Sequence, residues 1–528
     1  MPKTIGEILR EQARTRPEAV AIVLPHGRTE RRLTFAQLER DVTVAAGWLQ
    51  ARGLRKGSAV LVFVPMSAEL YIALLAMFRL GIVALFLDPS AGRQHIEQCC
   101  ARWAPDGLLA IPRAHLLRLR SAALRRIPLK MVTAGWIPGA IRWLARGGTA
   151  TAAEGVSSEA VDPGDAALVT FTSGSTGLPK AAVRTHGFLV AQHRVLEPSI
   201  ALKAGEVDLA TLPIFTLANL ASGVTTVIPD VDLRRPGNVD AARVFEQVER
   251  FGVTRITGSP ALFERLIEHG RATARTLPAL RKLHTGGAPV FPRLLDGLRA
   301  LAPGAEIVAV YGSTEAEPIA HLAAGEISPE DRAAMQNGCG LLAGPPVSEI
   351  ALRILRDRWV APRGDITGAQ LEAETLPADE VGEIVVSGEH VLRGYLGGVG
   401  DEETKFRVDG TVWHRTGDAG MLDQRGRLWL LGRCAARIDD GHGRFYPFAV
   451  ECVAMNFTEV QRAAVLAHEG ARWLVIETRA DRRAIEPRLL AATRWAHIEQ
   501  IRFVENMPVD KRHNAKIDYP ALRRVLGI

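Results

Sequence analysis

The chain has 528 residues, of which 47% are hydrophobic and 23% are charged. This composition excludes a disordered chain, and the length predicts two to four folded units. The net charge of +7 rests on arginine, because only nine of the 65 basic residues are lysine. We interpret the arginines as scattered among acidic residues, which argues against nucleic acid as a partner. A modest basic face beside anionic lipid remains an open alternative.

The first half of the chain alternates helical and strand-like segments. Residues 5–15 and 34–52 have helical patterns, and Thr34 is the expected N-cap of the second. Short apolar runs predict buried strands, at residues 59–64, 83–87, 168–172, 208–211, 254–258 and 282–285. Strands and helices in alternation predict parallel sheets covered by helices on both faces.

Residues 59–88 are the only candidate for a membrane span. Their apolar runs are interrupted by Glu69 and Arg79, and neither run reaches the roughly 20 residues that a span needs. A strand, a buried helix and a second strand are predicted instead. The start of the chain lacks a signal-peptide pattern, so a cytoplasmic protein is expected.

The five cysteines do not form C-x-x-C pairs and have no histidines at metal-binding spacing. We predict that Cys99 and Cys100 are small, buried apolar residues.

The composition of the sequence changes at several places along the chain. Residues 146–165 lack periodicity and predict a surface linker, and residues 361–377 form a second polar insertion. Residues 383–387 and 427–431 predict further strands. A shorter α+β segment follows, and we expect a large domain over residues 1–432 and a small domain over 433–528.

Residues 169–180, VTFTSGSTGLPK, form the most informative segment. A Ser/Thr/Gly loop after an apolar strand presents backbone N–H groups and hydroxyls, and Lys180 adds a mobile ammonium; this combination suits phosphate oxygens. The spacing is not that of a Walker A loop. The segment resembles the phosphate loop of the acyl-adenylating superfamily, which includes acyl-CoA synthetases, peptide-synthetase adenylation domains and luciferases. By this resemblance the ATP-binding residues here are Thr172, Ser173, Gly174, Ser175, Thr176, Gly177 and Lys180.

Paired glycines follow the predicted strand at 282–285, in the run TGGAP. Bare backbone lets a flat ligand lie close to the chain. Alone, the run is only a turn. The resemblance implies that Gly286, Gly287 and Ala288 pack against adenine.

The run VYGSTE at residues 310–315 places a hydroxyl beside a carboxylate after a buried strand. Such oxygens can bind Mg²⁺ or donate to phosphate. The resemblance implies that Tyr311 stacks on adenine beside Gly312, that Thr314 holds the α-phosphate and that Glu315 binds the metal. A capped helix start with Thr314 and Glu315 in its first turn is the structural alternative.

The run HRTGD at residues 414–418 offers a carboxylate beside a glycine, which we interpret as a turn. The resemblance implies that Asp418 accepts the ribose hydroxyls and that Arg433, in a Gly-Arg pair, also reaches the ribose. The family often has an acidic residue two positions after this arginine, where Ala435 stands here. This departure leaves the pivot of a domain rotation open.

Near the C-terminus, residues 508–517 read PVDKRHNAKI. Adenylation needs a cation aimed at the carboxylate oxygen and the α-phosphate. The resemblance supplies a lysine from a small, mobile C-terminal domain, usually after a glycine. Lys516 follows Ala515 instead, and its distance from Pro508 is two residues longer than usual. Lys511 competes for the role, but Ile517 after Lys516 fits the pattern better.

These motifs occur in the family's order across residues 169–516, so the resemblance spans essentially the whole chain. It implies an α/β fold with a large domain of parallel-rich sheets sandwiched by helices. It also implies formation of acyl-AMP and pyrophosphate from a fatty acid, with ATP and Mg²⁺ as cofactors.

Three segments, at residues 213–220, 229–236 and 508–516, look like those of the olefin-pathway β-lactone synthetases. Those enzymes adenylate a long-chain β-hydroxy acid, whose own hydroxyl then displaces AMP and closes a lactone. A long-chain acyl-CoA synthetase with CoA as acceptor is the alternative, although residues 439–444, DDGHGR, lack the K-x-x-G run common in CoA ligases. A non-catalytic protein on this fold is a third alternative, opposed by the intact motif residues. Peripheral membrane contact and assembly with pathway enzymes also stay open.

His186 and His193 invite a role as bases. We interpret His186 instead as a first-turn residue of the helix after the phosphate loop, and neither histidine is assigned to catalysis.

Overall fold

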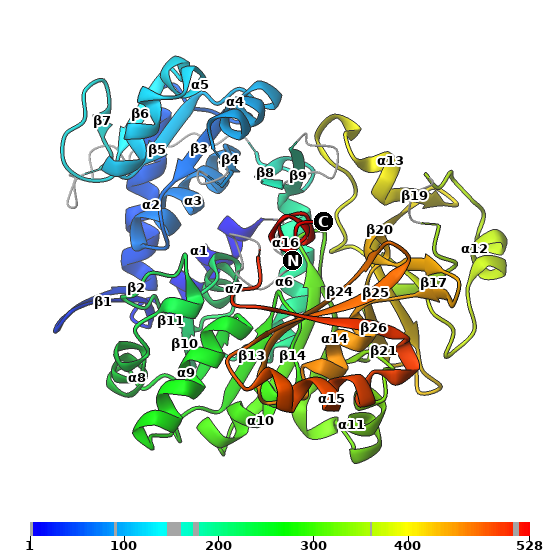
Figure 1. Cartoon of the computed structure of the whole chain (residues 1–528). Helices are drawn as coiled ribbons and strands as arrows, with labels where there is room; N and C mark the ends of the chain where they lie inside the picture. The colour runs from blue at the N-terminus through cyan, green and yellow to red at the C-terminus, as the bar shows by residue number, and fades with distance from the viewer. Residues whose placement is uncertain (1–3, 89–91, 145–159, 173–178, 359–361, 510–516) are drawn as a thin grey trace. The chain divides into compact units, whose positions relative to one another are not determined.

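The computed structural model describes residues 4–88, 92–144, 160–172, 179–358, 362–509 and 517–528. The whole chain is drawn in Figure 1. It divides into two compact units. The first comprises Met1–Asp230 and Glu389–Asp401, and the second comprises Val231–Gly388 and Glu402–Ile528.

The first unit contains a mostly parallel sheet. Within the described residues its strand order is β7-β6-β5-β3-β4-β8-β9, and only β9, at one edge, runs antiparallel to its neighbour. Its strands are β3 (Ala59–Phe63), β4 (Val83–Phe86), β5 (Gly107–Ala110), β6 (Leu129–Val132), β7 (Ile141–Arg142), β8 (Ala166–Thr172) and β9 (Lys180–Thr185). A further set pairs in the order β10-β11-β1-β2, and consists of β10 (Val207–Ala210), β11 (Thr225–Val227), β1 (Val20–His26) and β2 (Thr29–Thr34).

Helices of the first unit carry the apolar faces that the sequence predicts. They are α1 (Ile5–Thr15), α2 (Phe35–Gln50), α3 (Ala68–Leu80), α4 (Arg93–Arg102), α5 (Ala122–Arg126), α6 (His186–Ser199), α7 (Pro213–Ala221) and the 3₁₀ helix η2 (Pro112–Leu119). Thr34 caps α2, because its side chain accepts a hydrogen bond from the N–H of Gln37 at 3.2 Å. Helix α3 is buried along nearly its whole length, so the strand–helix–strand prediction for residues 59–88 is confirmed.

Within the described part of the chain, every helix is too short or too polar to cross a bilayer. Cys99 and Cys100 are free thiols buried in one hydrophobic cluster, as predicted.

The second unit begins with three parallel strands and one antiparallel strand. They are β12 (Arg255–Gly258), β13 (Lys282–Gly286), β14 (Glu306–Ser313) and the antiparallel β15 (Ala316–Ala323). The accompanying helices are α8 (Ala241–Arg250), α9 (Pro260–Thr273), α10 (Pro292–Leu301) and α11 (Pro329–Gln336).

An antiparallel sheet follows in the order β16-β21-β20-β18-β17, with β19 paired to β20. Its strands are β16 (Leu341–Gly344), β17 (Ala351–Leu355), β18 (Gly382–Ser387), β19 (Lys405–Val408), β20 (Thr411–Leu422) and β21 (Leu428–Arg433). Two short helices, α12 (Gly368–Glu374) and α13 (Asp401–Thr404), lie between these strands in the chain.

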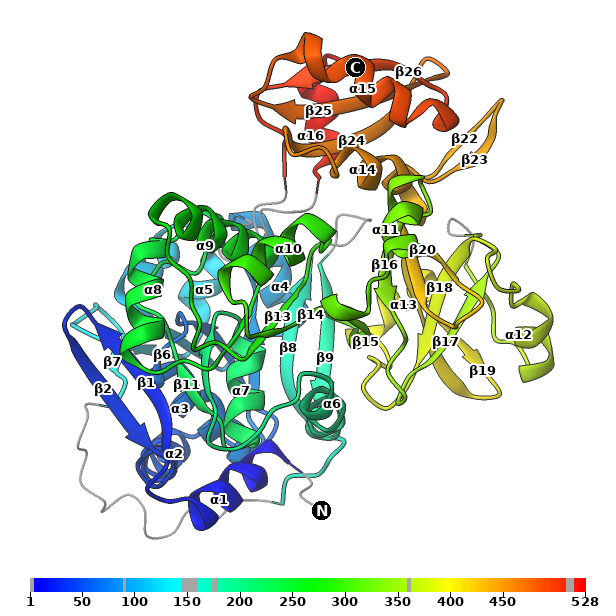
Figure 2. The ribbon, with the colours of Figure 1, turned by 90° about the horizontal axis from the view of Figure 1, so that it is seen from below.

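The C-terminal segment forms a small sheet with helices on both faces, visible in orange and red in Figure 2. Leu474 and Ile476 pack with Leu489 of α15, whereas the alternate residue Val475 packs with Leu522 of α16. The elements are β22 (Ile438–Asp440), β23 (Gly443–Phe445), β24 (Val460–His468), β25 (Ala471–Thr478), β26 (Ile498–Val504), α14 (Phe448–Ala454), α15 (Arg482–Ala492) and α16 (Tyr519–Leu526).

One local prediction was wrong, and two others need comment. Residues 416–418 lie inside strand β20 rather than in a turn, because β20 pairs with β18 and β21 on its two sides. The polar insertion at residues 361–377 includes helix α12, which Thr367 caps. The predicted surface segment at residues 146–165 lies mostly outside the described residues, although Ala160–Asp165 belong to the described part.

Candidate active site

Three predicted adenosine-binding residues meet in the second unit. The hydroxyl of Tyr311 donates a hydrogen bond to Oδ2 of Asp418 at 2.7 Å. Arg433 Nε lies 3.1 Å from Oδ1 of the same carboxylate. Strands β20 and β21 hold this pair, because Asp418 and Arg433 are opposite each other in the antiparallel register. Residues more than a hundred positions apart in the chain therefore form one cluster.

The carboxylate of Asp418 shifts the pKa values of both of its partners. Burial and the neighbouring Asp418 carboxylate raise the pKa of Tyr311 well above its ordinary value, so this residue stays a neutral donor. The negative charge of Asp418 also raises the pKa of Arg433, and Tyr311 and Glu315 make smaller contributions in the same direction. The arginine side chain is 53% exposed, whereas the aspartate is 19% exposed. A carboxylate with a fixed orientation thus faces accessible space, as hydrogen bonding to vicinal hydroxyls requires.

The β13–α10 connection supplies bare backbone beside this cluster. A Cβ at Gly286 would lie 2.5 Å from the carbonyl oxygen of Val310, so only glycine fits against β14 there. Gly287 has a φ of +80°, and a Cβ built on it would meet nothing within 4 Å. Gly287 and Ala288 line the same cavity as Tyr311.

Thr314 and Glu315 connect β14 to β15. The Ser313 hydroxyl accepts hydrogen bonds from the N–H groups of Glu315 at 3.2 Å and Ala316 at 3.3 Å, which closes a tight turn. Strand β15 begins at Ala316, so the alternative of a capped helix start is wrong. Because β14 and β15 are antiparallel, Thr314 and Glu315 project from a hairpin tip.

Glu315 and Thr314 provide hard oxygen donors for a divalent cation. No group of three His, Cys, Asp or Glu residues that could hold a metal occurs among the described residues. Mg²⁺ is usually bound by one or two carboxylates together with substrate phosphates rather than by an all-protein cage. The donor set therefore fits Mg²⁺ that arrives with a nucleotide.

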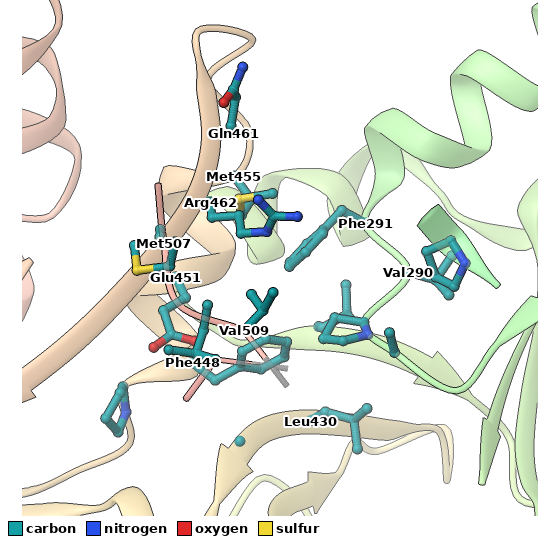
Figure 3. Close-up of a pocket in the computed structure, with 18 of the residues that line it drawn as sticks. Val290, Phe291, Leu430, Phe448, Glu451, Met455, Gln461, Arg462, Met507 and Val509 are labelled. Atoms are coloured by element: carbon teal, nitrogen blue, oxygen red, sulfur yellow. The ribbon is translucent and has the colours of Figure 1, made fainter. Parts of the chain in front are cut away.

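The cluster opens into a cavity of about 1750 Å³ within the second unit. Figure 3 shows another part of this cavity, whose labelled lining is largely apolar and includes Phe291, Phe448, Met455 and Met507. The Phe291 and Phe448 rings approach to 6.1 Å between centroids. The cavity thus combines a polar cluster with an apolar wall.

Glu451 is a further residue of this cavity that the sequence analysis missed (Figure 3). It is only 7% exposed, and burial raises its pKa to about 7 despite hydrogen bonds from Tyr519 and Val465. The Tyr519 hydroxyl donates to Oε1 at 2.7 Å, and the N–H of Val465 donates at 3.0 Å. A single glutamate in the apolar run 445–455 is the sequence signal that could have revealed it.

Lys180 belongs to the first unit, where it begins strand β9. Its side chain is 8% exposed, and Gly400 makes room for its stem, since a Cβ there would lie 2.7 Å from Lys180 Cδ. The ammonium lies 5.8 Å from the centroid of the Tyr395 ring. Thr172 is opposite Lys180 in the β8–β9 register, so the phosphate-loop segment joins two paired strands.

Several predicted site residues lie outside the described residues. They are Ser173, Gly174, Ser175, Thr176, Gly177 and Lys516, together with the competing Lys511. Val509 and Ile517, which flank the last two, form an isolated antiparallel bridge.

His186 is the first residue of α6 and is fully buried. Burial lowers its pKa to about 4, and its ring lies edge-on to Phe78, with 5.8 Å between centroids. This position agrees with the structural interpretation of His186.

Comparison with known protein families shows that the chain is an adenylate-forming ligase. The family model for AMP-binding enzymes matches residues 9–396, and the chain belongs to this family. As a member it is an AMP-forming ligase that acts on a carboxylate substrate and uses ATP.

Named relatives refine this similarity. Olefin beta-lactone synthetase from Stenotrophomonas maltophilia is 34% identical, with 98% of this chain and 96% of the relative covered. The protein of the same name from Xanthomonas campestris pv. campestris is also 34% identical, with 97% and 95% covered. Feruloyl-CoA synthase from an Amycolatopsis species is 29% identical, with 88% and 85% covered.

A solved structure of an anthranilate CoA ligase in complex with anthranoyl-AMP shares the fold. The TM-score is 0.81 at 18% identity, and the match covers 100% of this chain and 98% of that chain.

Proposed function

We propose that the chain adenylates a long-chain β-hydroxy fatty acid and closes it to a β-lactone with release of AMP. The similarity to two olefin beta-lactone synthetases over nearly the full length carries this proposal. In the first step a carboxylate oxygen attacks the α-phosphorus of ATP, and pyrophosphate leaves. In the second step the β-hydroxyl oxygen attacks the acyl carbon and displaces AMP, and the hydroxyl proton passes to water.

The chain's residues would bind and orient ATP in this scheme. Asp418 and Arg433 would hold the ribose, and Tyr311 would cover adenine opposite the backbone of residues 286–288. Gly312 lies near the end of β14, where a Cβ would be 3.1 Å from the carbonyl oxygen of Ala316 in the next strand. The missing side chain therefore lets the two strands approach closely beside Tyr311. Thr314 would donate to the α-phosphate, and the loop at residues 172–177 with Lys180 would bind the other phosphates. Mg²⁺, with Glu315 as its protein ligand, would neutralise charge on the phosphates.

We also propose that residues 433–528 act as a small mobile domain that brings Lys516 to the reacting carboxylate. Two hydrophobic clusters support this boundary, because their buried members all lie between Ile438 and Leu522. A lysine ammonium there would stabilise the charge that accumulates between the carboxylate and the α-phosphate.

A long-chain acyl-CoA synthetase is the second candidate, since feruloyl-CoA synthase is among the relatives. CoA would then be the acceptor in place of the substrate's hydroxyl. Both schemes share the first step and an apolar substrate, and we expect a cytoplasmic protein that meets this substrate at a membrane surface or through pathway enzymes.

The lysine assignment is tested by comparing Lys516→Ala with Lys511→Ala in an assay of pyrophosphate release. We expect Lys516→Ala to lose about 100-fold or more in rate, the usual effect of removing one preorganised charge-stabilising group. Lys511→Ala should stay near wild type. A selective loss in Lys511→Ala would reassign the lysine, and two fully active variants would exclude this mechanism.

A further inference from the structure

One segment of the first unit concentrates the positive charge of the protein. Residues 107–144 contain six arginines and one lysine, and no aspartate or glutamate, which gives +7. The formal charge of the whole chain is also +7. The expectation that arginines are scattered among acids is therefore wrong for this segment.

These seven cations have no ion pair with any described residue, in contrast to some of the arginines in the rest of the described chain. Arg79, for example, pairs with Glu39 at 2.7 Å, and Arg415 pairs with Glu383 at 2.8 Å. Within the segment, Arg118 contributes to lowering the pKa of Lys130, after burial as the larger cause. The segment therefore keeps seven positive charges outside any ion pair, although the carboxylate of Glu97 accepts hydrogen bonds from Ser121 and Ala123 at the start of α5.

The same segment carries the three most exposed large apolar side chains of the described residues. Trp136 is 80% exposed, Leu119 is 77% exposed and Leu116 is 62% exposed. In a 3₁₀ helix, side chains three positions apart align, so Arg113, Leu116 and Leu119 share one face of η2. All three are exposed.

Hydrogen bonds join η2 to strand β6 and to the loop after it, which carries Trp136. Arg118 Nη1 donates to the carbonyl oxygen of Pro138 at 3.1 Å, and the His115 ring lies 3.1 Å from the carbonyl oxygen of Met131. The neighbouring β6, β7 and α5 are drawn in cyan in Figure 1, and β7 is the edge strand of the sheet. We call the exposed residues Arg113, Leu116, Leu119, Arg120, Arg126 and Trp136 of this segment the arginine-rich face.

We propose that the arginine-rich face docks on the surface of an anionic lipid bilayer. Clustered arginines are attracted to the negative surface potential of such a bilayer. Exposed leucines and a tryptophan are suited to the boundary between headgroups and acyl chains. Nucleic acid would match the charge but leave the apolar side chains exposed to water. This inference does not depend on the acceptor in the proposed reaction.

Binding is tested with the full chain and vesicles of equal parts phosphatidylglycerol and phosphatidylcholine, by co-sedimentation. Arg120→Glu with Arg126→Glu should weaken binding at least about 25-fold, from about fivefold for each arginine near the surface. Both side chains are exposed and have no hydrogen bond to a described residue. Arg40→Glu with Arg235→Glu makes the same change in net charge at two other exposed positions, and should bind as wild type does.

The apolar contribution is tested with Leu119→Ser and Trp136→Ser together, which should weaken vesicle binding while the thermal unfolding midpoint stays unchanged. Wild type should not bind vesicles of phosphatidylcholine alone. Failure of wild type to bind the anionic vesicles, or equal losses in the two arginine pairs, would overturn the proposal. So would preferential binding of duplex DNA, or a dimer in solution that the serine variant abolishes.

Discussion

Asp418 is the residue on which the proposed nucleotide site depends most directly. Its two carboxylate oxygens have different partners, the Tyr311 hydroxyl and the Arg433 guanidinium. Hydrogen bonds that involve a charged group contribute more than neutral ones. We therefore expect loss of the Asp418 carboxylate to weaken ATP binding far more than loss of the Tyr311 hydroxyl or the Arg433 guanidinium.

We expect Asp418→Asn to raise the KM for ATP by about 10- to 100-fold, the range for a lost charge-assisted hydrogen bond. Tyr311→Phe keeps the aromatic ring and removes only one donor, so its KM for ATP should rise less than tenfold. Pyrophosphate release at varied ATP concentration measures both values. An unchanged KM in Asp418→Asn would show that the carboxylate does not bind the nucleotide.

Glu451 makes stability depend on pH. Its pKa is raised from 4.5 to about 7 by burial, so the folded chain keeps this proton after the unfolded chain has lost it. Stability is therefore fully present below about pH 4.5 and is lost as the pH rises through about 7. The loss is of the order of 3 kcal/mol once complete.

Glu451→Gln should remove this dependence. At pH 5 its thermal midpoint should be close to that of wild type, whereas at pH 8 the variant should melt at the higher temperature. Glu469→Gln, at a side chain that is 85% exposed, is the matched control and should change neither value. Parallel melting curves for Glu451→Gln and wild type at both pH values would contradict the assignment.

At the scale of elements, the contact between β13 and β14 fixes the surface that we propose for adenine. Gly286 meets the backbone of Val310 where a Cβ has no space, and the two residues are partners in the parallel register. Any side chain there would separate the strand that ends in the bare backbone from the strand that carries Tyr311.

We expect Gly286→Ala to lower the thermal midpoint, at a cost of about 1–3 kcal/mol for overpacking, and to raise the KM for ATP. Gly325→Ala is the control, since a Cβ there meets nothing within 4 Å and no positive φ is required. Thermal unfolding and ATP titration check both variants. A Gly286→Ala protein with wild-type stability would show that β14 can move away freely.

The sequence predicted whether a segment forms a helix or a strand more reliably than it predicted which strands pair. The helix at Ile5–Thr15 and the strand–helix–strand run through α3 were predicted because their apolar patterns are local. Strand β9, with the sequence KAAVRT, was missed because it has few strong strand formers and depends on pairing with β8. The TGD motif was misread as a turn for the same reason.

The same difference between local patterns and non-local contacts applies to the candidate site. Resemblance predicted Tyr311, Asp418 and Arg433 individually, but the register that sets Asp418 opposite Arg433 is a non-local property of β20 and β21. Glu451 carries no motif, and its raised pKa arises from burial that only the folded chain creates. The sequence therefore predicted which residues belong to the candidate site better than it predicted which residues they contact in the fold.

At the scale of the whole molecule, the proposed roles are distributed along the entire chain. Lys180 belongs to the first unit, the Tyr311–Asp418–Arg433 cluster belongs to the second, and Lys516 stands near the C-terminus. The first step of the reaction is common to ligases of this family. Only the acceptor separates a β-lactone synthetase from an acyl-CoA synthetase.

The most direct test of the proposed function is mass spectrometry of the products from a long-chain β-hydroxy acid, ATP and Mg²⁺, with and without CoA. We predict a product lighter than the acid by one water, formed equally well without CoA. A matched fatty acid without the β-hydroxyl should give no such product. A thioester that forms only with CoA, and no dehydrated product, would contradict the account and identify an acyl-CoA synthetase.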